Sequence, residues 1–262
     1  MPYIAREWLN LSIRWFHVFA GIMWIGQTYF FTWLDHRFSE EKQVWMVHSG
    51  GFYVVEKQKV PEMLPGTLHW FKWEAALTWL SGVSLLFLVY YNGKLMNDPD
   101  VWNVSNAKAT AVSVVFLVAA WLIYDLLWVS PIARQELVGV VLSYALLVGA
   151  ISLATRLFSH RAAYMQTGAV MGTLMAANVW MRILPAQRQL IAATKAGTQP
   201  DMRLASVARQ RSKHNTFMVI PVVFIMISNH FPVATYGHDY AWIILAALVL
   251  VGWGVAQLIR TH

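Results

Sequence analysis

The chain has no cysteine among its 262 residues, and only 13% of its residues are charged. Without cysteine, these residues cannot form disulfides, thiolate metal sites, iron–sulfur clusters or a covalently attached c-type haem. A soluble domain carries roughly a quarter charged residues, whereas hydrophobic residues here reach 58%. The composition therefore excludes an ordinary soluble enzyme and predicts a polytopic membrane protein.

Long apolar segments recur along the chain, and each approaches or exceeds the ~20 residues that cross a bilayer. They lack the alternation of strands, so we expect helices. The predicted transmembrane helices, about seven in number, span residues 8–34, 67–91, 107–129, 137–157, 164–184, 215–231 and 240–259. The predicted fold is all-α: a polytopic membrane helical bundle in which residues 1–262 form a single integral membrane domain. Long cytoplasmic loops are expected near residues 35–66 and 185–214. The first is predicted to contain a turn followed by a short extended piece at residues 50–55, and the second a basic surface helix with a break at residues 197–200.

Basic residues are distributed unevenly between the two predicted faces. Those on the face of the N-terminus are Arg6, Arg14, Lys94, Lys108, Arg156 and Arg161, and all other lysines and arginines fall on the face of the C-terminus. The positive-inside rule then predicts a periplasmic N-terminus and a cytoplasmic C-terminus, in a multi-pass protein of the bacterial inner membrane. The formal net charge of +7 is thus explained by topology: the lipid bilayer is the expected partner, and no nucleic acid is expected.

Four histidines lie within or at the edge of apolar segments: His17, His69, His214 and His230. A histidine facing lipid would leave ring nitrogens without partners, so these are candidate ligands of haem iron. Depth pairs His17 with His230 near the outer face and His69 with His214 near the inner face. His214 and His230 lie about 24 Å apart on an ideal helix, but on different faces unless Pro221 bends it. The alternative is four histidines that are hydrogen-bonded at helix interfaces.

Two neighbours of His17 add to the haem hypothesis. Gly21 shares the helical face of His17 and would leave space for a flat macrocycle, and Arg14 could pair with a haem propionate. The alternative is close helix packing through Gly21 with an Arg14 that reaches the membrane surface.

Charged and polar residues also collect at the inner end of the predicted bundle. Lys72 and Glu74 lie in the second span, Asp125 near the end of the third, Arg182 at the end of the fifth, and Asn215 at the start of the sixth. We predict that Lys72, Arg182 and Asn215 bind an anionic substrate and that Glu74 or Asp125 transfers its proton as the catalytic group. The alternative is a purely structural network of salt bridges.

Four segments of the chain resemble the membrane domain of bacterial cytochrome-c-linked urate hydroxylases, the urate oxidase N-terminal domain family. They are residues 17–26, 48–53, 68–75 and 215–232, the last ending in Ser-Asn-His-Phe-Pro. The resemblance implies a membrane redox protein with one or two haem b groups that oxidises urate to 5-hydroxyisourate in purine catabolism and passes electrons to a cytochrome c.

The family pattern continues with a further span and a Cys-x-x-Cys-His haem-attachment site, which the printed sequence does not contain. A urate hydroxylase built on this chain would therefore need a separate cytochrome c. The alternative function is a non-catalytic haem-binding or anchoring subunit of a respiratory electron-transfer complex, with other subunits of that complex as partners and quinol as a possible electron source. A transporter is disfavoured because no internal repeat is detectable.

Overall fold

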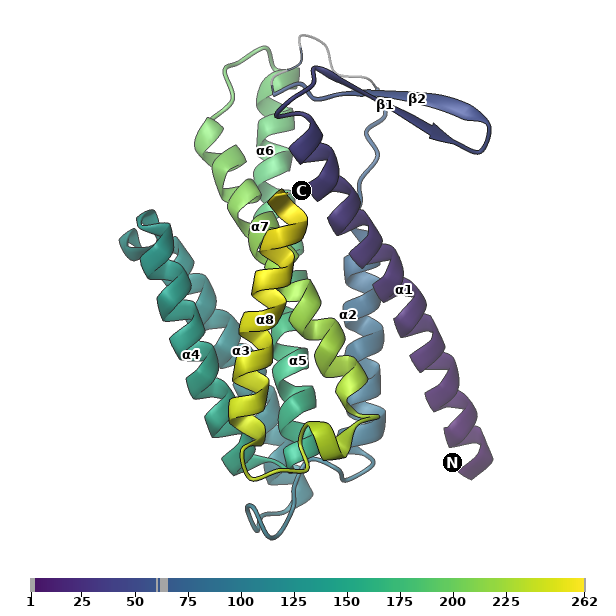
Figure 1. Ribbon diagram of the computed structural model, residues 1–262, viewed down its shortest axis with the longest axis vertical. Coiled ribbons are helices and arrows are strands. Elements are labelled where there is room, and N and C mark those ends of the chain that lie inside the picture. Colours follow the sequence, from purple (N-terminus) through teal and green to yellow (C-terminus); the bar gives the residue numbers. More distant parts are fainter. Residues whose placement is uncertain (1–2, 60, 62–65, 262) are drawn as a thin grey trace.

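The computed structural model describes residues 3–59, 61 and 66–261, which form an all-α bundle with one small β-hairpin (Figure 1). The α-helices are α1 (Tyr3–Arg37), α2 (Trp73–Leu85), α3 (Asn106–Val129), α4 (Glu136–Leu157), α5 (His160–Ala177), α6 (Leu184–Lys195), α7 (Met202–Ser228) and α8 (Ala241–Thr261). Two π-helical segments, η1 (Leu86–Tyr91) and η3 (Asn178–Ile183), and two short 3₁₀ segments, η2 (Pro131–Arg134) and η4 (Pro232–Ala234), complete the helical elements. The termini lie toward opposite ends of the bundle.

Every predicted span coincides with a helix, and five helical stretches are long and apolar enough to cross a membrane. They are Trp73–Tyr91, Asn106–Val129, Glu136–Leu157, His160–Lys195 and Ala241–Thr261, which indicates a multi-pass membrane protein. The stretch His160–Lys195 joins α5, η3 and α6 without a break over 36 residues. At about 1.5 Å per residue this is roughly 54 Å, well beyond the ~30 Å hydrocarbon core of a bilayer.

Two predicted boundaries were wrong. The second helix begins at Trp73, not at residue 67, because the aromatic residues before it turn toward neighbouring elements: the ring of Phe71 packs on that of Phe31, 5.1 Å away. The sixth span begins at Met202, not at residue 215. Its basic first half is helical but too polar to be recognised as a span, so His214 lies inside α7 and not at its start.

The two predicted loops are largely structured, and both lie at the end of the bundle that holds the C-terminus (Figure 1). Residues 185–214 form a helical hairpin of α6 and the first half of α7, and Asp201 caps α7 by accepting a hydrogen bond from the backbone N–H of Arg203. Residues 35–66 contain strands β1 (Gln43–His48) and β2 (Gly51–Glu56), paired antiparallel about a turn in which Ser49 and Gly50 both have positive φ.

Helix α5 is the most enclosed element, because each residue from Ala162 to Gly168 is buried. Small residues on a membrane helix let neighbouring backbones approach closely. The buried Gln166 is satisfied by Ser113 of α3, which donates to its Oε1 at 2.7 Å and accepts from its Nε2 through the carbonyl oxygen at 2.9 Å. By contrast, α1 lies on the outside of the bundle, packed mainly on α2, with side chains such as Trp15 78% exposed.

The packing of α7 on α8 makes a specific prediction about two glycines of α8. A Cβ on Gly252 would lie 2.8 Å from ring carbons of the buried Pro221, whereas a Cβ on Gly254 would meet nothing within 4 Å. We expect Gly252→Ala to lower the free energy of unfolding by about 1–3 kcal/mol through overpacking. Gly254→Ala should leave it unchanged or raise it by up to about 1 kcal/mol. Equilibrium unfolding in mixed micelles measures both, and equal effects would contradict the proposed contact.

Candidate functional site

The π-helical segment η3 connects two groups of side chains that lie near the C-terminal end of the bundle. A π turn is rare and often marks a functional site, because it places an extra residue within a helical turn. In this segment Asn178 and Arg182 contact α3 and α7, whereas Trp180 contacts the residues around the start of α2. One local distortion thus orients side chains toward both groups.

The first group is an ion cluster of one carboxylate and two guanidinium groups. Asp125 of α3 accepts from Nε of Arg182 at 2.9 Å and also pairs with its terminal nitrogen. Its Oδ1 accepts from a terminal nitrogen of Arg211 of α7 at 2.9 Å. Arg211 is only 1% exposed, and its guanidinium lies 4.9 Å from the ring centre of Tyr124. Because one negative charge faces two positive ones, the cluster keeps a net positive charge.

A chain of hydrogen bonds joins this cluster to the predicted residues of α7. Asn178 donates to the hydroxyl of Tyr124 and to Oδ1 of Asn215, both at 2.9 Å. The Tyr124 hydroxyl lies 2.7 Å from Nδ1 of His214, whose ring packs 4.1 Å from that of Trp128. The structure therefore brings together Asp125, Arg182, His214 and Asn215 in one network, which includes the salt bridge considered as the alternative to substrate binding.

The second group is a tryptophan cluster around Lys72, formed by Trp70, Trp73 and Trp180. The ammonium nitrogen of Lys72 lies 5.9, 5.5 and 5.8 Å from the three ring centres, within the range of cation–π attraction. Beside it, Oε2 of Glu74 and the indole nitrogen of Trp180 are buried, and neither has a hydrogen-bond partner among the described residues. Buried polar atoms are nearly always paired in native proteins, so this unpaired acceptor and donor are candidate contacts for a polar ligand.

His17 lies in the interface of α1 and α2 with one ring nitrogen engaged. Its Nδ1 is 3.0 Å from the carbonyl oxygen of Thr78 and 3.0 Å from the hydroxyl of Ser81. A carbonyl oxygen only accepts, so Nδ1 carries the proton, and in the neutral ring Nε2 keeps its lone pair. A Cβ on Gly82 would lie 3.0 Å from the ring, so the glycine provides the space for it.

The family model described as Urate oxidase N-terminal matches residues 3–262 of the chain. The chain belongs to this family. The match confirms the resemblance seen in the four sequence segments and extends it over almost the whole chain. No curated protein and no solved structure matches the chain.

Among the described residues, the members of the two predicted histidine pairs of this urate oxidase N-terminal domain make no direct contact with each other. His69 and His230 are exposed, and within the described ranges no hydrogen bond or ring contact joins His17 to His230 or His69 to His214. Gly21 faces α2, where a Cβ would lie 3.9 Å from the side chain of Thr78. Among the described residues, no group of three or more histidines, aspartates or glutamates is arranged to hold a metal ion.

Arg14 forms a local contact in this urate oxidase N-terminal domain: its guanidinium donates to Oδ1 of Asn10 one turn earlier, at 3.2 Å, and the pair is exposed. The pairing of Arg14 with a haem propionate therefore stays a prediction, since the only contact of its guanidinium given by the described residues is this exposed amide.

Sequence reasoning missed Tyr124, Asn178, Trp180 and Arg211. Helical spacing could have identified two of them. Arg211 lies one helical turn before Asn215, and Asn178 lies one turn before Arg182, so each shares a helix face with a predicted residue. Arg211 was assigned to a basic surface helix outside the membrane, because the start of α7 was set too late. The π geometry that turns Trp180 toward α2 leaves no mark in the spacing of apolar residues.

Proposed function

We propose that this urate oxidase N-terminal domain is a membrane redox enzyme that oxidises urate to 5-hydroxyisourate and passes the electrons to a cytochrome c. Family membership supports the proposal over the whole chain. The observation that carries it to a site is the tryptophan cluster, in which Lys72 lies among three indole rings and Glu74 and Trp180 each have a buried polar atom without a partner among the described residues.

These groups complement urate, a flat anion with ring N–H donors and carbonyl acceptors. Indole faces suit a planar heterocycle, Lys72 offsets its negative charge, Glu74 can accept from a ring N–H, and Trp180 can donate to a carbonyl oxygen. We assign proton transfer to Glu74 and not to Asp125, because both oxygens of Asp125 are engaged by arginines. Arg182, with Asn215 in the same network, would hold η3 and so position Trp180.

The reaction balances with cytochrome c as the oxidant. Urate and one water give 5-hydroxyisourate, two protons and two electrons, and two ferric cytochrome c molecules each take one electron. Glu74 would receive one of the two protons and release it toward the nearby aqueous face. A carboxylate placed in this way contributes about 10²–10⁴-fold to a rate.

His17 would hold the iron of a haem b through its free ring nitrogen, and its surroundings fit this role. Ligating histidines commonly donate their other ring N–H to a backbone carbonyl, as Nδ1 of His17 does to Thr78. His214 resembles it in having Nδ1 bonded to Tyr124. Haem bound through such residues would accept and deliver electrons one at a time.

The proposal predicts a b-type difference spectrum and urate-dependent reduction of added ferric cytochrome c by the purified protein. We expect His17→Ala to lose the b-type band of the haem that His17 would hold. It should also lower cytochrome c reduction at least tenfold, because no other side chain would replace this ligand. His238→Ala, in an exposed loop, is the control and should change neither. A b-type band without any urate-dependent reduction would favour the non-catalytic electron-transfer subunit, and the absence of both signals would contradict the proposal.

A further inference from the structure

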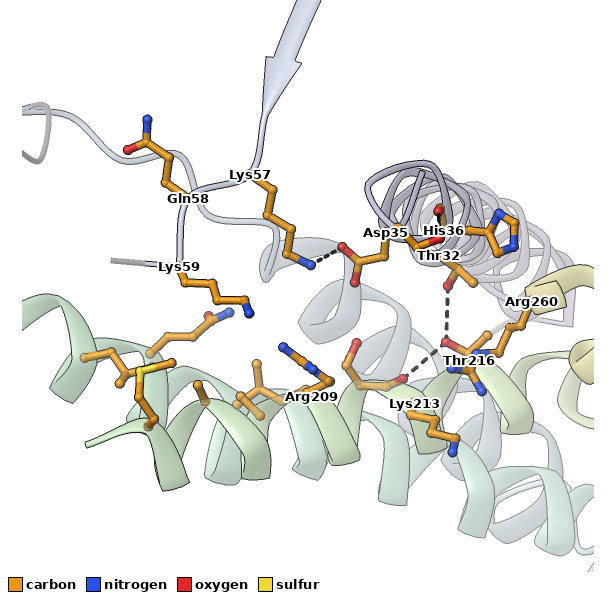
Figure 2. Close-up of a pocket in the computed structure, with 18 residues that line it drawn as sticks. Thr32, Asp35, His36, Lys57, Gln58, Lys59, Arg209, Lys213, Thr216 and Arg260 are labelled. Atoms are coloured by element: carbon orange, nitrogen blue, oxygen red, sulfur yellow. Dashed lines mark hydrogen bonds and ion pairs between the residues drawn. The ribbon is translucent and has the colours of Figure 1, made fainter. Parts of the chain in front are cut away.

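A cavity of about 610 Å³ opens at the end of the bundle that holds the C-terminus, separate from the tryptophan cluster and from the ion cluster. Its walls come from the end of α1, the segment after β2, helices α6 and α7, and the last turn of α8 (Figure 2). None of the residues of the two clusters lines it. Its size lies within the range of small-molecule sites.

The lining is strongly basic. The charged side chains of the lining are Asp35, Lys57, Lys59, Arg209, Lys213 and Arg260. Asp35 pairs with Lys57, and Lys213 pairs with Glu136 outside the cavity. In the part of the chain that the structure describes, the remaining three cations have no carboxylate partner.

Two of these unpaired cations approach the same space from opposite walls. Figure 2 shows Lys59 extending from the segment after β2 and Arg209 extending toward it from α7. The guanidinium of Arg260 lies 5.3 Å from the ring centre of Phe217, on the α8 side. Like charges that face one another are stabilised by an anion between them, and a guanidinium matches the oxygens of a phosphate in a bidentate geometry.

The rest of the lining supplies neutral hydrogen-bonding groups. The hydroxyls of Thr32 and Thr216 lie 3.4 Å apart where α1 meets α7, and the Thr216 hydroxyl donates to the carbonyl oxygen of Ser212 at 3.3 Å. The Ser212 hydroxyl and the amide of Gln187 also reach the cavity. Hydroxyl and amide groups can bond phosphate oxygens or the polar atoms attached to a phosphate.

We propose that this cavity binds the phosphate group of an anionic molecule, with Arg209 and Lys59 as its principal ligands and Arg260 as an additional source of positive charge. The excess of cations over carboxylates suits a phosphate group, and the volume exceeds what a single phosphate needs, so the phosphate belongs to a larger molecule. The cavity opens at the end of the bundle to which the positive-inside rule assigns the cytoplasm. The phosphate is supplied either by the headgroup of an anionic lipid or by a soluble phosphate compound on that side.

The test uses the purified full chain with two probes. Pyrophosphate is titrated by isothermal calorimetry to detect a soluble ligand. Nanodiscs of phosphatidylglycerol, compared with nanodiscs of phosphatidylcholine, are followed by native mass spectrometry to detect a retained lipid. We expect saturable binding of at least one probe, and Arg209→Gln and Lys59→Gln should each weaken it by about tenfold, as the loss of one charge-assisted hydrogen bond implies.

The matched control is Arg188→Gln, which removes the same charge from the exposed face of α6, outside the cavity, and should leave binding within about twofold of the original.

A second variant, Ser212→Glu, keeps every cation but adds a carboxylate to the lining, and it should also weaken binding by about tenfold. Circular dichroism confirms the fold of each variant, and Lys59→Gln lies on an exposed segment where folding is unaffected. Binding of pyrophosphate alone identifies a soluble ligand, and retention of phosphatidylglycerol alone identifies a lipid. If neither probe binds, or if Arg188→Gln weakens binding as much as Arg209→Gln does, the proposal is overturned.

Discussion

Replacing Asp125 with asparagine is expected to lower the free energy of unfolding by about 3–5 kcal/mol, the cost of removing one partner of a buried ion pair. Asp125 is the carboxylate that pairs with both Arg182 and Arg211. Arg211 dominates the effect because its side chain is 1% exposed, whereas that of Arg182 is 38% exposed and can reach water. Equilibrium unfolding in mixed micelles, followed by far-ultraviolet circular dichroism, measures the change.

Two further variants test the cause of this loss. Adding Arg211→Met to Asp125→Asn removes the buried charge left without a partner, and most of the lost free energy should return. Glu136→Gln breaks the pair with Lys213, whose side chains are 57% and 33% exposed, and should cost no more than about 1 kcal/mol. If Asp125→Asn costs as little as Glu136→Gln, Arg211 does not depend on Asp125 for its charge balance.

Glu74→Gln is expected to lower the turnover of urate about 100-fold or more, because glutamine keeps the size of the side chain but cannot take up a proton. The b-type band and the thermal stability should not change, since Oε2 of Glu74 has no partner among the described residues to lose. Steady-state reduction of cytochrome c across a range of pH gives kcat and KM.

The control for this experiment is Glu40→Gln, a change of the same kind at an exposed residue that pairs with Arg37. It should leave turnover within about twofold of the original, as surface substitutions generally do. Turnover of Glu74→Gln within about threefold of the original would rule out Glu74 as the base, and proton transfer would then need another group in the tryptophan cluster.

The all-α class could be predicted from the sequence, and each of the seven predicted spans coincides with a helix, of which five stretches are long and apolar enough to cross a membrane. The start of α7 could not be predicted, because a membrane helix that continues into water becomes polar, and its first half was therefore interpreted as part of a separate surface helix. Arg211 was misplaced for this reason, although it is among the most buried side chains of the structure.

The candidate site was predictable in its residue types but not in its grouping. Asp125 and Arg182 were expected at one depth, and they do pair. Lys72 and Glu74 were placed with them, yet they belong to a second group, because η3 turns Trp180 away from the ion cluster and toward α2. The phosphate-binding cavity could not be foreseen, since Lys59, Arg209 and Arg260 come from three distant segments that only the fold brings together.

The π-helical segment η3 also determines where this chain can gain or lose residues over evolutionary time. Because the π turn accommodates one extra residue, deleting that residue would restore a regular α-helix and keep α6 in phase with α5. The side chains that the π turn itself orients, those of Asn178 and Trp180, would instead change direction and leave their partners. The connection at residues 196–201, which follows α6, carries no such constraint. Relatives of this chain should therefore differ freely in length between α6 and α7, whereas between Gln166 and Gln187 they should either keep this length or lose the one residue of the π turn together with those contacts.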